Sequence, residues 1–328
     1  MKRKYDRVNI LRWIERCDAN RIPITSPKTN EEITRNLVPN KILKTIIEMI
    51  ADGGNEEFRI QLEETENAIP QNSFTNETLR EAVRSYLLEP TITVQQYGEI
   101  GTWNVLNVND MAGIFYNAQS FNQNINAWNV SGVTTMVGMF NNASSFNKPL
   151  NSWNVSNVTN MKYMFHYASS FNQSLNSWDV GNVTNMENML KYTVSFNQEL
   201  NNWNVSNVTN MNSIFNGAKS FNKNINGWNV SKVKNMSSMF ADAKAFNQPL
   251  GSIDFSGNDV SGRGWNVLEV TKMSYMFTNA TSFNQPLNNW NVSDVSGMES
   301  MFYGAKSFNK PLNDWNVSTR LYRYTSRC

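Results

Sequence analysis

The stretch WNVSNVTNM occupies residues 153–161 and returns unchanged at residues 203–211. The tryptophan that opens it recurs at residues 103, 128, 153, 178, 203, 228, 265, 290 and 315, a spacing of 25 residues with one gap of 37. A fixed period of this length is typical of repeat proteins, because one unit cannot bury its apolar face alone and each neighbour covers it. The sequence therefore predicts a stack of 25-residue turns.

Within each repeat, with its tryptophan counted as position 0, apolar residues recur at +2, +5, +8, +11, +12, +15, +18 and +22. Tryptophan and valine at 0 and +2 suit a short strand, whereas +8, +11, +12 and +15 match one face of a helix. In the repeat of Trp153, Thr159 and Asn160 stand just before that stripe and can cap a helix start. We expect an α/β repeat solenoid with one strand and one short helix per 25-residue turn.

The recurrent polar and sulfur-containing side chains admit two interpretations each. Asparagines at +1, +19 and +23, such as Asn154, Asn172 and Asn176, suit hydrogen-bond ladders and turns, with a ligand site as the alternative. The methionines at +8 and +11 suit the core, with a soft partner groove as the alternative. The single histidine, His166, stands at a variable position, and we expect an exposed side chain there.

The outward positions of the expected strands indicate no particular ligand. They hold mostly serine, asparagine or glycine, as at Ser156, Asn157, Gly181 and Asn182. We therefore expect no charged or aromatic patch that selects a class of ligand. One irregularity stands out: about twelve extra residues at 251–262, GSIDFSGNDVSG, account for the long tryptophan spacing. They are either a binding loop or a degenerate repeat fragment.

Composition excludes several classes of function. The chain has 29 basic and 27 acidic residues, so no global field points to nucleic acid or to a membrane surface. One histidine and two distant cysteines, Cys17 and Cys328, cannot build a histidine triad, a disulfide framework or a cysteine metal site. The charged N-terminus lacks the apolar run of a signal peptide, and nothing is typical of a membrane span. We expect an intracellular protein without metal, cofactor or catalytic side chain.

The repeats resemble the BspA-like leucine-rich repeat family, also described as the Mycoplasma lipoprotein-type repeat, through the pattern W-[ND]-V-S-x-V-x-x-M-x-x-[ML]-F. The preceding stretch, residues 73–102, is similar to that family's N-terminal cap: a helix from Asn76 to Glu89, then a turn at Tyr97 and Gly98. The resemblance implies a leucine-rich-repeat-like solenoid over residues 103–328 that contacts other proteins. Intracellular relatives occur in large DNA viruses; if this chain is viral, the resemblance implies a place in the host cytoplasm.

The first fifty residues differ in character. Apolar residues in YDRVNILRWIE and NLVPNKILKTIIEMI predict two helices joined by an irregular loop, with little core of their own. Residues 51–72 are acidic, contain Gly-Gly and Pro70, and are expected to be a linker.

This helix, loop and helix resemble the second half of a U-box, the metal-free relative of the RING finger found in ubiquitin ligases. The resemblance implies that a ubiquitin-conjugating enzyme is contacted by Ile10, Trp13, Pro27 and Pro39. It assigns structural roles to Tyr5, Asp6, Arg7, Thr29 and Asn40. Pro27 and Thr29 match the Pro-x-Thr motif of the U-box loop, and Pro23 and Thr25 are an alternative match to the same motif. The chain starts at Met1, beyond the loop and hairpin that open a complete U-box, so the resemblance covers part of the groove.

Two functions follow as hypotheses. In the first, the chain is a ubiquitin-ligase-like adaptor: residues 1–50 recruit a conjugating enzyme and the solenoid binds an unidentified protein substrate, with transfer promoted by proximity. In the second, it is a non-enzymatic repeat protein for protein–protein interaction, viral structural or host-factor-binding, with a degenerate U-box.

Overall fold

The structure, a computed structural model, describes residues 74–251 and 264–317. Contacts divide the chain into two units, residues 1–71 and 72–328, and every described residue belongs to the second. The U-box-like module predicted at 1–50, the linker predicted at 51–72 and all but the first residue of the 251–262 insertion lie outside the described residues.

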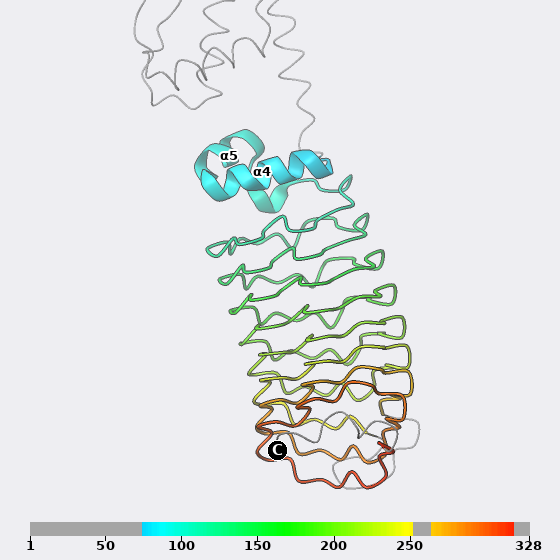
Figure 1. The fold of residues 1–328 in the computed structure, drawn as a ribbon. Helices are drawn as coiled ribbons and strands as arrows, with labels where there is room; N and C mark the ends of the chain where they lie inside the picture. Colours follow the sequence, from blue (N-terminus) through cyan, green and yellow to red (C-terminus); the bar gives the residue numbers. More distant parts are fainter. Residues whose placement is uncertain (1–73, 252–263, 318–328) are drawn as a thin grey trace, which may run out of the picture. The chain divides into compact units, whose positions relative to one another are not determined.

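Two helices precede the repeats (Figure 1). Helix α4, Asn76–Leu88, begins at a capping box in which Thr75 and Thr78 exchange side-chain-to-backbone hydrogen bonds. Its buried residues, Leu79, Ala82, Val83 and Tyr86, follow the spacing of one helix face. The edge of the Tyr86 ring meets the first repeat tryptophan, Trp103, at 6.0 Å between centroids. The predicted helix over 76–89 is thus confirmed, and it covers the first turn of the stack.

Helix α5, Pro90–Tyr97, was not predicted from the sequence. Its run of threonine, isoleucine and valine has a weak helix propensity because β-branched side chains lose rotamer freedom in a helix. Pro90 at the first turn favours the helical start, and the expected turn follows at Gly98, which has a φ of 75°. A 3-10 turn, η1 over Ile100–Thr102, leads into Trp103. Neither α4 nor α5 has the length and apolarity needed to cross a bilayer.

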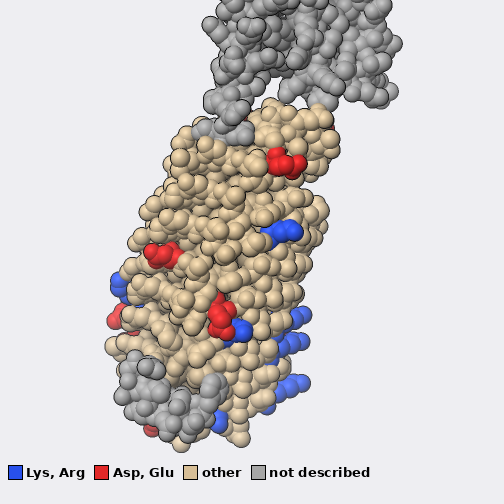
Figure 2. Space-filling model, turned by 180° about the vertical axis from the view of Figure 1, so that it is seen from behind, with Lys and Arg blue, Asp and Glu red and all other residues tan. Residues whose placement is uncertain are grey.

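Residues 103–251 and 264–317 form a regular stack of turns (Figure 1). Within these described residues the repeats contain neither a strand nor an α-helix, so the predicted α/β solenoid with one strand and one helix per turn is wrong. Successive turns are joined at +7 by isolated parallel bridges, for example between Asn160 and Asn185. On the face seen in Figure 2, charged side chains are sparse, and those of Lys and Arg gather along one edge towards the C-terminal end.

The direction of the backbone hydrogen bonds explains why no helix forms. In the repeat of Trp153, the backbone N–H groups at the even positions +8 to +14 donate to backbone carbonyls of the next turn. The donor–acceptor distances are 2.8–3.0 Å, and the pairs are Met161 to Asn185, Tyr163 to Glu187, Phe165 to Met189 and Tyr167 to Lys191. N–H groups at the odd positions +11 to +15 donate three residues back within the turn. An α-helix would need each of these groups to donate four residues back.

Left-handed residues fix this arrangement. In every described repeat that reaches them, positions +10 and +14 have positive φ, as at Tyr163 (59°) and Tyr167 (58°). A left-handed residue after every few right-handed ones turns the chain back on itself and prevents helical propagation. Asn160, predicted to cap a helix, instead accepts the N–H of Lys162 in a local turn.

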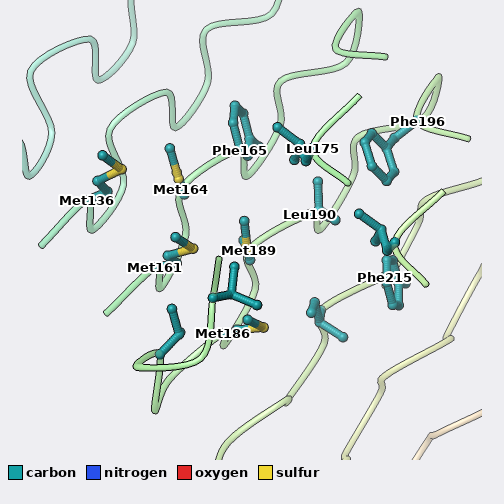
Figure 3. Packing of buried hydrophobic residues seen from close by; sticks show 14 of the residues in the cluster. Met136, Met161, Met164, Phe165, Leu175, Met186, Met189, Leu190, Phe196 and Phe215 are labelled. Carbon is teal, nitrogen blue, oxygen red and sulfur yellow. The ribbon is translucent and has the colours of Figure 1, made fainter. Parts of the chain in front are cut away.

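The core consists of columns of equivalent side chains, most of them identical, with Leu190 at the position that Phe165 and Phe215 hold in neighbouring turns (Figure 3). Met136, Met161 and Met186 come from successive turns and are fully buried, so the methionine stripe is core. The phenylalanines at +18 form an unbroken stack with centroids 5.8–6.1 Å apart: Phe121, Phe146, Phe171, Phe196, Phe221, Phe246, Phe283 and Phe308. Each column extends through the stack, so a turn is stable only between neighbours.

The asparagines are ladder and turn residues, as predicted. The side-chain oxygen of Asn172 at +19 accepts the N–H of Asn197 at 2.9 Å and the Gln198 side chain at 2.9 Å. Asn154 at +1 accepts the N–H of Ser156, and Asn176 at +23 accepts that of Asn202 in the next turn. These bonds satisfy backbone groups at corners where no regular sheet or helix would do so.

The extra residues near 251–262 leave the stack continuous. Trp228 and Trp265, which flank them, stack at 6.5 Å between centroids with an interplanar angle of 2°. The indole N–H of Trp265 also donates to the carbonyl of Ile225, as the other tryptophans do to equivalent residues. The core columns therefore continue from the turn before the insertion to the turn after it.

Candidate functional site

The site residues predicted from the U-box resemblance cannot be placed. Those assigned to conjugating-enzyme contact, Ile10, Trp13, Pro27 and Pro39, and those assigned structural roles, Tyr5, Asp6, Arg7, Thr29 and Asn40, all lie outside the described residues. The candidate site must therefore be built from the surface of the repeats.

One segment of each turn presents variable side chains outwards. Positions +8, +12 and +15 are buried, and most residues at +9, +10, +13 and +14 are half-buried or exposed, although some, such as Asn188, Ser213 and Ala241, are buried. Because the turns stack in register, equivalent outward residues form columns on a continuous surface, here called the turn face. Its chemistry depends on the residues that occupy these four positions.

Aromatic side chains gather on the turn face in the repeats of Trp153 and Trp178. The ring of His166 lies 4.4 Å from that of Tyr167 and 5.3 Å from that of Tyr163. Tyr167 in turn stacks on Tyr192 of the next repeat at 4.7 Å. We call Tyr163, His166, Tyr167 and Tyr192 the aromatic patch. Tyr167 is 46% exposed although its ring contacts two neighbours.

The backbone of the aromatic patch is strained. Tyr163, Tyr167 and Tyr192 have φ values of 59°, 58° and 58°, a region that costs a bulky residue about 1–2 kcal/mol. Asparagine, glycine, serine or aspartate occupies most of the equivalent positions in other repeats and tolerates this region better. Strain of this kind clusters at functional sites, which favours a functional use of these three side chains, although Tyr275 (61°) has the same backbone outside the patch.

Lysines and a glycine support the rings. The Lys162 ammonium lies 5.1 Å from the centre of the Tyr163 ring, and that of Lys191 lies 5.6 Å from the centre of Tyr192. Tyr192 packs over Gly217 of the next turn, where a Cβ atom would lie 2.2 Å from the ring. Burial, together with the neighbouring Tyr167 and Asp242, raises the pKa of Tyr192, which therefore keeps its hydroxyl proton.

His166 is half-buried, so the expectation of an exposed side chain is wrong. Burial, and secondly the Lys191 ammonium, lower the pKa of His166 to about 4. Its Nε2 atom is buried and has no hydrogen-bond partner, and the same is true of the side-chain oxygen of Asn216, two turns along at the same position. Such groups are costly to leave unpaired, and because both atoms are buried, a partner could reach them only after the side chains shift.

The lowered pKa of His166 predicts that the stability of the fold depends on pH. Because the folded pKa lies below the unfolded value of 6.5, the unfolded chain takes up a proton first as the pH falls. The stabilisation is complete above pH 6.5 and is lost as the pH approaches 4. With allowance for the partial exposure of His166, we expect the wild type to lose about 1–2 kcal/mol more than His166→Asn between pH 7 and pH 4. Urea unfolding at several pH values measures this; parallel losses would contradict the burial of His166.

The rest of the described surface offers no competing site. An open depression of about 450 Å³ lies beside Trp128. Its asparagines Asn124 and Asn129 already accept hydrogen bonds from local turns. In the ranges 74–251 and 264–317, no three His, Cys, Asp or Glu side chains come together as a metal site would require.

The sequence analysis missed the aromatic patch. It took the outward residues to be those of a strand near Ser156, whereas the variable outward surface is the turn face. A tally of each repeat position would have shown tyrosine at +14 in two successive repeats. The expectation of no aromatic patch is therefore wrong.

The chain matches the family described as Mycoplasma protein of unknown function, DUF285, over residues 87–199, 172–262 and 259–324. These stretches cover more than half of the 328 residues. The chain belongs to this family. The DUF285 match confirms the repeat resemblance, while it starts at residue 87 and leaves the U-box resemblance without support. No curated protein matches the chain.

Proposed function

We propose that this DUF285 protein is a non-enzymatic interaction protein whose repeat stack presents the turn face to a partner protein. The observation that carries the proposal is the aromatic patch, in which three tyrosines are held in left-handed backbone positions beside an unpartnered buried imidazole nitrogen. Tyrosine is enriched where proteins bind one another, since it combines a large apolar ring with a polar hydroxyl. The stacked core holds these side chains in place, which lowers the entropic cost of binding.

Site-specific photo-crosslinking tests this proposal. A benzophenone amino acid placed at Tyr167 in full-length protein should yield a discrete crosslinked protein in the native host cell. The matched control places it at Ser152, which is exposed at a corner of the preceding repeat. Crosslinks of equal pattern at both positions, or none at Tyr167, would exclude the turn face as the docking surface.

The ubiquitin-ligase hypothesis is a second candidate, favoured by the U-box-like residues of the N-terminal segment. In this hypothesis Trp13 and Pro27 help recruit a ubiquitin-conjugating enzyme, and transfer proceeds by proximity without a catalytic side chain. Purified full-length protein is assayed with a set of conjugating enzymes, with Trp13→Ala alongside. Ubiquitin discharge that Trp13→Ala abolishes supports the hypothesis, and no discharge with any enzyme rejects it.

A further inference from the structure

Three lysines occupy the same repeat position beside the turn face. Lys219, Lys244 and Lys306 all stand at +16 and are exposed; we call them the lysine column. Lys219 and Lys244 are in successive turns, because the N–H of Ala245 donates to the carbonyl of Lys219 at 3.1 Å. Only Thr281 stands between Lys244 and Lys306. Figure 2 shows blue side chains gathered along one edge of the stack towards its C-terminal end.

The lysine column adjoins the aromatic patch. Tyr192 packs over Gly217, and Lys219 follows Gly217 by two residues. Lys191, at +13, extends the positive charge to the patch itself, where its ammonium lies near the Tyr192 ring. Lys219 thus stands two residues after the glycine that Tyr192 covers, and Lys244 follows in the next turn, while Thr281 separates Lys244 from Lys306.

Lysines outnumber acidic side chains over the described part of the turn face and the lysine column: five of the former and three of the latter give a net charge of 5 − 3 = +2. Glu187 pairs with Lys162 at 3.0 Å, whereas Asp242 and Glu299 accept hydrogen bonds from neutral side chains and keep their charge. Among the ion pairs of the described residues, none involves Lys191 or the lysine column. Lys219 and Lys244 lie in neighbouring turns, and their like charges repel weakly in water, a repulsion that an anionic partner would relieve.

We propose that the partner contributes an acidic polypeptide segment, which lies along the lysine column with one end on the aromatic patch. This inference rests on the proposed function, and it specifies that the docking segment of the partner is acidic. Carboxylates of the segment pair with the ammonium groups, and its end packs against the exposed ring of Tyr167. The register of the column suits an extended or helical segment running parallel to the stack.

The same surface is poorly suited to nucleic acid. Protein–DNA binding typically uses about 6–10 phosphate contacts, whereas the column and Lys191 provide four ammonium groups. Bases of single strands stack on free aromatic faces. Here Tyr192 stacks on one face of Tyr167, the His166 ring lies beside Tyr167 at a tilt of 52°, and Tyr192 itself lies between Tyr167 and Gly217.

Fluorescence anisotropy with a labelled poly-glutamate peptide of about 20 residues tests the inference on full-length protein. The variant Lys219→Glu, Lys244→Glu, Lys306→Glu should raise the Kd about 10-fold or more, because it reverses all three charges at the docking surface. The control Lys232→Glu, Lys272→Glu, Lys310→Glu changes net charge equally at exposed positions off the turn face and should shift the Kd by less than about 2-fold.

Three results would overturn the inference: equal losses in the two variants, no binding to the wild type, or tighter binding of a single-stranded DNA of matched length and charge. A second column variant with Lys→Gln changes, and urea unfolding of each protein, exclude misfolding as the cause of a loss. The peptide assay needs no natural partner, so it can fail while crosslinking at Tyr167 succeeds, and the reverse. The chemistry of the segment and the docking function are thereby tested separately.

Discussion

Replacing Phe171 by alanine should lower the free energy of unfolding by about 3–5 kcal/mol. Phe171 is fully buried and its ring stacks on Phe146 and Phe196 at 5.9 and 6.1 Å, with Phe165 at 4.2 Å. The substitution removes the ring from a column that runs through neighbouring turns, so the resulting cavity cannot collapse without shifting them. Urea unfolding followed by tryptophan fluorescence measures the loss.

The control for Phe171 is Tyr303→Ala, at an aromatic residue that is 71% exposed on the turn face. It should change stability by less than about 0.5 kcal/mol, as is usual for surface substitutions. Comparable losses in the two variants would mean that the phenylalanine column does not stabilise the stack.

Proline at Asn142 should cost more than about 3 kcal/mol. Asn142 has a φ of 61°, which proline cannot adopt, and its N–H donates to the carbonyl of His166 at 2.7 Å. The substitution therefore breaks a left-handed turn and a bond between turns at once. The midpoint of urea unfolding and the temperature midpoint both report the loss.

Ser174→Pro is the matched control for Asn142→Pro. Ser174 stands at +21, where other repeats carry Pro149, Pro249 and Pro286, so proline should be tolerated within about 1 kcal/mol. If both substitutions were equally mild, position +14 would not be the left-handed donor described here. If both were severe, the repeats would not be equivalent.

The sequence predicted the stack and its core well. The tryptophan period gives the number of residues per turn, and the recurrent apolar positions, such as Met161, Phe165 and Phe171, are buried. Burial could be predicted because apolar residues recur only where each turn meets its neighbour. The ladder role of Asn172 followed from the same argument, since a corner residue must satisfy backbone groups.

The secondary structure within a turn could not be read from apolar spacing alone. The i, i+3, i+4, i+7 pattern from Met161 to Ala168 is shared by a helix and by successive tight turns. The deciding signal is at the intervening positions, where Gly113, Gly138 and Asn142 suit left-handed backbone. Tyrosines at Tyr163 and Tyr167 hid that signal, because bulky residues rarely adopt this conformation.

The aromatic patch was missed for the same reason. Without the correct backbone, the outward direction of His166, Tyr167 and Tyr192 could not be assigned, nor could their meeting across two turns. Comparing the residues at positions +13, +14 and +16 across the repeats reveals both the patch and the lysine column, once it is known which positions point outwards.

The central claim is that the N–H groups at +10 and +14 bond to the next turn, which places the turn-face side chains in columns. NMR scalar coupling across hydrogen bonds measures this directly in deuterated, ¹⁵N,¹³C-labelled protein. The account predicts coupling from the N–H of Tyr163 to the carbonyl of Glu187, 24 residues ahead. Coupling instead to the carbonyl of Thr159, four residues back, would reveal a helix and contradict the columns on which the docking surface depends.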